Sequence, residues 1–242
     1  MPKILAVQHS SSGGPGRFDD WLIESGVAVE VVKAGDGEPL PQWLEHDALL
    51  VLGGGFLPDE DDRAPWLAPT RALVQQALDR SVPIFGICLG GQMLAHVAGG
   101  TVEGDVGAPE SGSTPITIRA EATTDPLFHS FPDVVPAIEH HVDAITKLPP
   151  GAVWLARSER CPFQAFRVGE LAWGVQFHPE VEPARLRRWD PERLRSQGFD
   201  PDTVIATAVA DDPVSAPVWR TVAHRFARIV HDAKAGVTRT GS

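Results

Sequence analysis

The sequence predicts an α/β fold with an open, mainly parallel sheet and flanking helices. This prediction rests on short apolar runs that alternate with helix-patterned segments, and on the glycines and prolines that separate them. Ala48–Leu52, for example, is a continuous apolar run stopped by a glycine triplet, as expected of a strand buried on both faces. The predicted strands are 3–8, 27–32, 48–52 and 83–87, and the predicted helices are 18–24, 70–79 and 89–97.

The second part of the chain has a different pattern. Further strands are predicted at 114–118, 153–156 and 172–177, with prolines and glycines between them, which favours a partly antiparallel extension of the same sheet. Beyond Pro183 the chain becomes charged and helical, and its end is small and polar. The expected organisation is one domain over 1–190, a helical extension packed on it over 191–233, and a flexible tail over 234–242.

Composition narrows the functional classes. With 43% hydrophobic and 22% charged residues, the chain has the composition of a globular protein. Its net charge of -11 disfavours nucleic-acid binding, which usually needs a basic surface. No apolar run reaches the ~18 residues of a membrane span, and the N-terminal run is too short for the apolar core of a signal peptide. Cys88 and Cys161 are too few for a disulfide scaffold, so we expect a cytoplasmic location.

The most informative stretch is Gly86–Gln92 (GICLGGQ), between a predicted strand and a predicted helix. Glycines two residues before and after Cys88 allow the sharp turn that exposes a nucleophile above a sheet edge. The N-terminus of the following helix favours a thiolate, and the backbone N–H of Leu89 would point toward an oxyanion. An isolated cysteine is more often a small buried residue, so this turn alone leaves both interpretations open.

A second motif supplies a base for the cysteine and a carboxylate that can orient this base. His178 ends a predicted strand, at the edge where open α/β sheets place their chemistry, and Pro179 and Glu180 follow. The imidazole can take the thiol proton and later protonate a leaving amine, while Glu180 can orient the other ring nitrogen. Seen alone, the pair is more often a surface ion pair. Together with the turn, it predicts a triad of Cys88, His178 and Glu180.

At these residues the chain resembles the class I glutamine amidotransferases. The G-x-C-x-G-x-Q turn of the family matches Gly86–Gln92, and its H-P-E strand end matches His178–Glu180. Weaker matches are Val51–Gly54 to the oxyanion strand, His141-x-Asp143 to an H-x-D segment, and Cys161–Phe166 to the stretch before the histidine strand. The similarity runs from about residue 3 to about residue 190, and is greatest to stand-alone proteins similar to the amidotransferase domain of GMP synthase.

The resemblance implies a flavodoxin-like fold and a glutaminase reaction. Cys88 would attack the side-chain amide of glutamine to give a γ-glutamyl thioester and ammonia, and His178 would act first as acid and then as base. The remaining candidates are Gly54 and Leu89 for the oxyanion hole, and Gln92, Gly55 and His141 for substrate contacts.

Three functions stay open. In the first, the chain releases ammonia for a separate synthetase subunit, since the sequence has no ATP-binding P-loop pattern. In the second, it acts alone on γ-glutamyl compounds as a peptidase or hydrolase through the same thioester. In the third, it is a non-catalytic binding protein with the same fold. The presence of all three triad residues argues against this third function. No cofactor is expected, and no metal, because His140, His141 and Asp143 lack ligand spacing.

Overall fold

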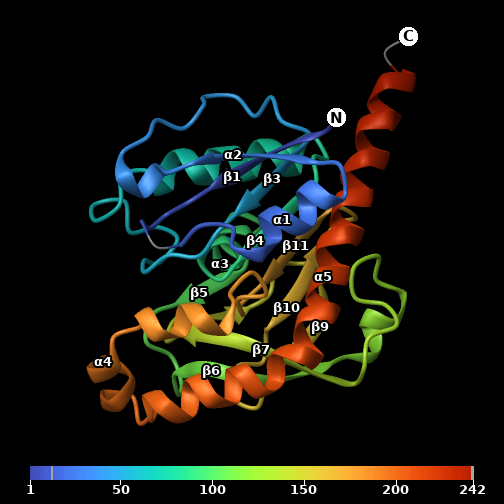
Figure 1. The fold of residues 1–242 in the computed structure, drawn as a ribbon. Coiled ribbons are helices and arrows are strands. Elements are labelled where there is room, and N and C mark those ends of the chain that lie inside the picture. Colours follow the sequence, from blue (N-terminus) through green and yellow to red (C-terminus); the bar gives the residue numbers. More distant parts are fainter. Residues whose placement is uncertain (12, 241–242) are drawn as a thin grey trace.

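A nine-stranded sheet forms the centre of the computed structural model, which describes residues 1–11 and 13–240 (Figure 1). Its strands are β1 (Lys3–Val7), β2 (Ala28–Val32), β3 (Ala48–Val51), β4 (Ile84–Ile87), β6 (Glu110–Ile118), β7 (Val134–His141), β9 (Val153–Arg157), β10 (Ala165–Val168) and β11 (Ala172–Val175). In the order β2-β1-β3-β4-β11 they are parallel, and β10, β9, β6 and β7 continue the sheet antiparallel. This architecture confirms the predicted fold class.

Each face of the parallel strands is covered by its own layer of helices. Odd-numbered residues of β1 pack with α2 (Leu67–Asp79) and α3 (Leu89–Val97). Even-numbered residues pack with α1 (Arg17–Glu24) and α5 (Pro201–Thr240), which lie side by side in Figure 1. Because successive side chains of a strand point to opposite faces, burial on both faces explains the continuous apolar runs in the sequence.

Strand register places the candidate residues at one edge of the sheet. β3, β4 and β11 are parallel neighbours, and Ile87 at the end of β4 pairs with Val175 at the end of β11. Since the carboxyl ends of parallel strands meet at the same edge, the segments that follow them lie together. These segments carry Gly53, Cys88 and His178.

Several elements were not predicted from the sequence. β7 and β10 belong to the antiparallel part of the large sheet, and β5 (Thr101–Glu103) pairs with β8 (Ala144–Lys147) in a small sheet of its own. β7 contains Pro136 and ends in two histidines, and this composition is not typical of a strand. It is tolerated because β7 is the last strand of the sheet and pairs on one side only.

The C-terminal region consists of a 3₁₀ helix, η3 (Pro183–Arg188), a short helix, α4 (Pro191–Ser196), and α5. α5 is one long helix that contains Pro213 and Pro217, within the stretch beyond Pro183 that was expected to be helical. Its backbone stays helical through Thr240, past residue 234, where the predicted tail begins. Residues 241–242 lie outside the described residues. The predicted domain boundaries and the flexible tail stay predictions. Among the described helices, none combines the length and apolarity that crossing a membrane requires.

Candidate active site

Cys88 occupies the tight turn between β4 and α3. Its backbone has φ 52° and ψ −109°, a conformation that non-glycine residues adopt rarely and at an energetic cost. A hydrogen bond from its N–H to the carbonyl oxygen of Val175 (2.8 Å) ties the turn to β11. The residue is 6% exposed and lines a cavity of about 250 Å³. A strained turn that directs a side chain into a cavity is the geometry of a nucleophile elbow.

The glycines around Cys88 are needed because backbones approach each other closely here. A side chain at Gly86 would collide with the backbone of Gly90, and one at Gly90 would collide with the carbonyl group of Val51. A Cβ at Gly91 would lie 2.5 Å from the carbonyl oxygen of Val175. The glycine spacing of the motif therefore reflects how tightly α3 packs against β3 and β11.

His178 follows β11 and reaches the same cavity. Its backbone N–H donates to the carbonyl oxygen of Ile138 on β7 (2.7 Å), and its Nδ1 lies 2.8 Å from Oε1 of Glu180. Gly53 fills the space beside both reactive groups: a Cβ there would be 2.7 Å from Cε1 of His178 and 3.5 Å from Cβ of Cys88. The structure thus brings Cys88, His178 and Glu180 together at one edge of the sheet.

Glu180 is buried and is held from behind by the start of α1. The backbone N–H of Arg17 donates to the carbonyl oxygen of Glu180 (3.1 Å). Gly16, with φ 53°, lies so close to this oxygen that any side chain there would collide with it. Backbone contacts therefore fix the position from which the carboxylate reaches His178.

Electrostatics favour the protonated form of His178. Burial lowers the pKa of the imidazole, but the nearby Glu180 carboxylate and Cys88 sulfur, with their hydrogen bonds, raise it well above its ordinary value. An imidazolium between a carboxylate and a sulfur atom stabilises a thiolate, which is the nucleophilic form of cysteine.

Gln176 is a neighbour of the nucleophile that the sequence did not single out. Its Nε2 lies 3.7 Å from Sγ of Cys88, and its Oε1 accepts a hydrogen bond from Nε2 of Gln92 (3.1 Å). Gln92 also donates to the carbonyl oxygen of Asp143 (3.1 Å) and is 3% exposed. Gln92 is thus linked to Cys88 through Gln176 and is absent from the cavity lining, and its contact with substrate stays a prediction.

The predicted oxyanion donors flank the Cys88 turn. Gly54 lines the cavity, where a Cβ would lie 2.7 Å from Cδ2 of Leu89 and 2.9 Å from Cβ of His9. Leu89 begins α3, so its backbone N–H is one of those that a helix leaves unpaired at its N-terminus. Gly55 also lines the cavity and has open space around it. The oxyanion and substrate roles of these residues stay predictions.

The two histidines that end β7 face opposite sides. His140 lines the cavity and stacks on Trp189, with 4.1 Å between the ring centroids. Burial, reinforced by the nearby positive charges of His178 and Arg193, lowers the pKa of His140 to about 4. His141 is absent from the cavity lining, so its predicted contact with substrate stays untested.

His141 belongs to a buried polar cluster. Its Nδ1 donates to the carbonyl oxygen of Asp143 (3.0 Å), and its Nε2 lies 3.1 Å from Oε2 of Glu110 and 3.4 Å from Oε2 of Glu139. Burial and the Glu110 charge raise the pKa of Glu139 well above its ordinary value, against the opposing effect of His178. This cluster joins β6 to β7.

Among the described residues, Glu110, His141 and Cys161 are close enough to share a metal ion, with ligand atoms within 4.8 Å of one another. However, Oε2 of Glu110 already accepts a hydrogen bond from Nε2 of Gln164 (2.9 Å) and faces His141. Burial raises the pKa of the Cys161 thiol, which disfavours the thiolate that metals bind. We therefore interpret these three residues as part of the buried polar cluster and not as a metal site.

One wall of the cavity was not predicted. Arg185, Arg188, Trp189 and Arg193, from η3 and α4, line it opposite the strand ends; we call these residues the arginine wall. No spacing in the sequence marks these arginines among the chain's 21 Lys and Arg residues, because only the fold of the C-terminal segment brings them to the cavity.

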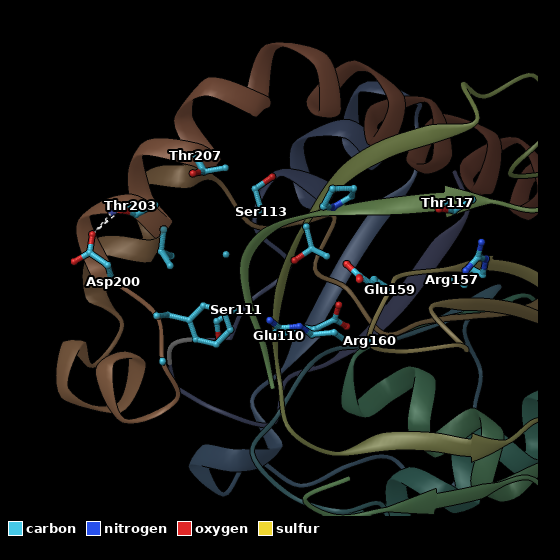
Figure 2. Close-up of a pocket in the computed structure, with 16 residues that line it drawn as sticks. Glu110, Ser111, Ser113, Thr117, Arg157, Glu159, Arg160, Asp200, Thr203 and Thr207 are labelled. Carbon is cyan, nitrogen blue, oxygen red and sulfur yellow. Dashed lines mark hydrogen bonds between the residues drawn. The ribbon is translucent and has the colours of Figure 1, made fainter. Parts of the chain in front are cut away.

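A larger cavity, of about 690 Å³, lies along β6, the loop after β9 and the start of α5 (Figure 2). Asp200 accepts a hydrogen bond from the Thr203 hydroxyl (2.6 Å) at its α5 end. Of the described residues, those that line it include no cysteine or histidine. Cysteine and histidine chemistry therefore belongs to the smaller cavity.

Comparison with protein families agrees with this geometry. The model of the family described as glutamine amidotransferase class-I matches residues 18–195, which include the Cys88 turn and the His178 strand end. The chain belongs to this family. The resemblance drawn from the motifs is confirmed, as is the predicted enzyme class, a cysteine-dependent amidohydrolase.

Solved amidotransferase structures share the fold over nearly the whole chain. A glutamine amidotransferase from Thermotoga maritima is similar with a TM-score of 0.83 and 28% identity, covering 93% of this chain and 98% of that chain. Another from Methylobacillus flagellatus has a TM-score of 0.76 and 27% identity, covering 96% of this chain and 95% of that one. Most of the C-terminal region of this amidotransferase is therefore within the part that these structures match.

Sequence relatives include subunits of GMP synthase. A subunit of the glutamine-hydrolysing GMP synthase of Methanopyrus kandleri is 39% identical over 128 residues, which are 52% of this chain and 65% of the relative. The corresponding subunit of Pyrococcus furiosus is 41% identical over 102 residues, 42% of this chain and 52% of the relative. The chain thus matches between about half and about two thirds of these subunits, and 26% of the GMP synthase of Streptomyces avermitilis.

Proposed function

We propose that this amidotransferase hydrolyses the side-chain amide of glutamine at Cys88 and passes the ammonia to a separate partner. The observation that carries the proposal is the arrangement of Glu180, His178 and Cys88 at one cavity, with the imidazole bonded to the carboxylate at 2.8 Å. A cysteine paired with an oriented histidine is the arrangement that forms and breaks acyl-thioesters.

In the first half of the reaction, the Cys88 thiolate attacks the amide carbon of glutamine. The carbonyl oxygen becomes an oxyanion, which the N–H groups of Gly54 and Leu89 would stabilise; losing one such donor typically costs about 2.7–4 kcal/mol of barrier. The raised pKa of His178 keeps a proton available for the leaving nitrogen. The C–N bond then breaks, giving ammonia and a γ-glutamyl thioester on Cys88.

In the second half, His178 has lost its proton and acts as a base. It takes a proton from water, which attacks the thioester carbonyl, and glutamate leaves as the sulfur regains its negative charge. Glu180 stabilises the imidazolium at each stage where it forms.

The separate partner is inferred from the relatives. Several similar proteins are named as single subunits of glutamine-hydrolysing GMP synthases, which implies a complementary subunit in those enzymes. The sequence of this chain has no ATP-binding P-loop pattern with which it could activate an ammonia acceptor itself. Both observations support transfer of ammonia to another chain.

The test is to measure ammonia and glutamate released from glutamine, with and without a GMP synthase subunit that lacks an amidotransferase domain. We expect slow release by the chain alone, complete dependence on Cys88, and faster release with the partner. Release that persists in Cys88→Ala contradicts the proposed nucleophile. Release that no such partner changes contradicts ammonia transfer to this class of synthetase.

A second candidate function is hydrolysis of other γ-glutamyl compounds through the same thioester. The arginine wall is the specific observation that favours it, because glutamine carries a single carboxylate and this wall presents three arginines.

A further inference from the structure

The arginine wall concentrates positive charge on an otherwise acidic molecule. The chain has 32 Asp and Glu residues against 21 Lys and Arg residues, yet Arg185, Arg188 and Arg193 line a cavity that contains one carboxylate. That carboxylate, Glu180, is already bonded to His178. The cavity therefore has positive charge that its own residues do not neutralise.

The arginines are available for a ligand. In the described part of the chain, ion pairs are formed by other arginines, among them Arg195, which pairs with Glu192 on α4. With the residues that the structure describes, Arg185 makes one long hydrogen bond, which it donates to the carbonyl oxygen of Gly14 (3.5 Å). Asp20 and Glu182 share an adjoining surface with Arg185 and Arg188, at distances too long for an ion pair.

The backbone that carries these arginines is anchored. Leu186 on η3 and Leu194 on α4 are each 2% exposed. Leu186 belongs to an apolar cluster with Ile138 of β7 and Val204 of α5. Trp189, between the two elements, stacks on His140 in the cavity. The arginines therefore project from a fixed support.

The charge of glutamine does not match the charge of the three arginines. Glutamine is a zwitterion in which one carboxylate is offset by one ammonium group, so it leaves most of the arginine charge unmatched. Arginine binds carboxylates with paired, charge-assisted hydrogen bonds, and such pairs discriminate strongly between charged and neutral ligands. A substrate with a further carboxylate matches the cavity better.

We propose that the arginine wall selects γ-glutamyl compounds whose amine portion carries a free carboxylate, such as γ-glutamyl amino acids. This inference rests on the proposed thioester chemistry and names its preferred substrate class. The γ-amide bond is cleaved as in glutamine: the C–N bond breaks, His178 protonates the leaving amine, and an amino acid is released in place of ammonia. Arg185, Arg188 and Arg193 bind and orient the substrate and take no part in bond breaking.

The test compares kcat/KM for γ-glutamylglycine, γ-glutamylglycinamide and glutamine. The first two differ only in the carboxylate that the wall is proposed to bind. We expect the wild-type chain to favour γ-glutamylglycine over its amide by about tenfold or more, the range of a charge-assisted hydrogen bond. This preference falls with added salt, because screening weakens exposed charges.

Arginine variants test whether the preference for γ-glutamylglycine over its amide depends on the arginine wall. In Arg188→Gln/Arg193→Gln the ratio of kcat/KM for γ-glutamylglycine to kcat/KM for its amide is expected to fall at least severalfold, mainly through a higher KM for γ-glutamylglycine. Arg187→Gln and Arg195→Gln remove neighbouring arginines of η3 and α4 that do not line the cavity, and both are expected to keep the preference.

The outcomes separate this inference from the function on which it rests. Labelling of Cys88 by an electrophilic glutamine analogue reports on the nucleophile alone. If Cys88 is labelled and the two dipeptides react equally, or glutamine is preferred to both, the inference is overturned and the glutaminase proposal stands. If Cys88 is inert in the folded chain, both fail. If the arginine variants weaken only the binding of a protein partner, the wall is a protein contact and the inference is overturned.

Discussion

The two walls of the active-site cavity are built in different ways. The triad wall, which we define as Gly53, Cys88, His178 and Glu180, consists of segments that follow parallel strands and are fixed by backbone contacts. The arginine wall consists of long side chains on short helices, of which Arg188 and Arg193 are exposed. The groups proposed to make and break bonds are thus held by the backbone, whereas the proposed charge selection needs only a fixed support for mobile side chains.

The largest expected effect comes from removing the nucleophile. Cys88→Ala should lower kcat/KM for glutamine roughly 10⁴-fold or more, since the members of a triad act as a unit. Cys161→Ala is the matched control, because this cysteine is also buried but is absent from the cavity lining. Equal losses in both variants, with both folded, would exclude a special role for Cys88.

Glu180→Gln tests the orientation and charge of His178, and should lower kcat/KM roughly 10²- to 10³-fold. Its pH dependence has a definite sign. Glu180 raises the pKa of His178, so the wild-type imidazolium persists well above pH 6.5. Removing the carboxylate charge lowers this pKa, so the alkaline limb of the kcat/KM profile should move to lower pH. An unchanged alkaline limb would show that another group controls it.

Gly53→Ala tests how tightly the triad wall is packed. The added Cβ would lie 2.7 Å from Cε1 of His178, so the imidazole must move away from the nucleophile. We expect a loss of about 10²-fold in kcat, the usual cost of a misplacement near 1 Å. Gly55→Ala, with no neighbour within 4 Å, should lose much less. Similar losses from both variants would contradict the packing argument.

The smallest effect on the chemistry is expected from the support of the arginine wall. Leu186→Ala removes an anchor that is 2% exposed and should lower the free energy of unfolding by about 2–3 kcal/mol. Leu186 is linked to the triad wall through the apolar cluster that it shares with Ile138 and Val181, and we expect the backbone hydrogen bonds of that wall to keep kcat for glutamine within about threefold of wild type. Denaturant unfolding and steady-state kinetics measure the two quantities. A collapse of kcat in a folded variant would show that the two walls are coupled.

Sequence patterns predicted the parallel half of the fold because its central strands, such as β3 and β4, are continuous apolar runs next to glycines or prolines. β7 was missed because Pro136, Glu139 and the two histidines break the apolar pattern expected of a strand, although its partner β6 is the preceding strand in the sequence. α5 lies in the stretch beyond Pro183 that was expected to be helical, but the sequence did not predict that one helix would continue through Pro213 and Pro217.

In the site, too, the residues in local sequence motifs were predicted, and those brought together by distant contacts were not. Cys88, His178 and Glu180 were predictable because each follows a strand within a short local motif. Gln176 and the arginines of η3 and α4 carry no local signal, and their relation to the cavity depends on contacts between distant segments. The cavity-lining histidine, His140, differs from the neighbouring His141 only by the alternation of side chains along β7, whose register the sequence did not give.

The proposed mechanism requires a covalent γ-glutamyl intermediate on Cys88, which can be sought by trapping it. The chain is mixed with glutamine, quenched in acid and analysed by peptide mass spectrometry. We expect one glutamyl group attached through a thioester to the peptide that contains Cys88, and no such group in Cys88→Ala. Release of glutamate without this adduct under rapid quenching, or an adduct on Cys161, would rule out thioester chemistry at Cys88.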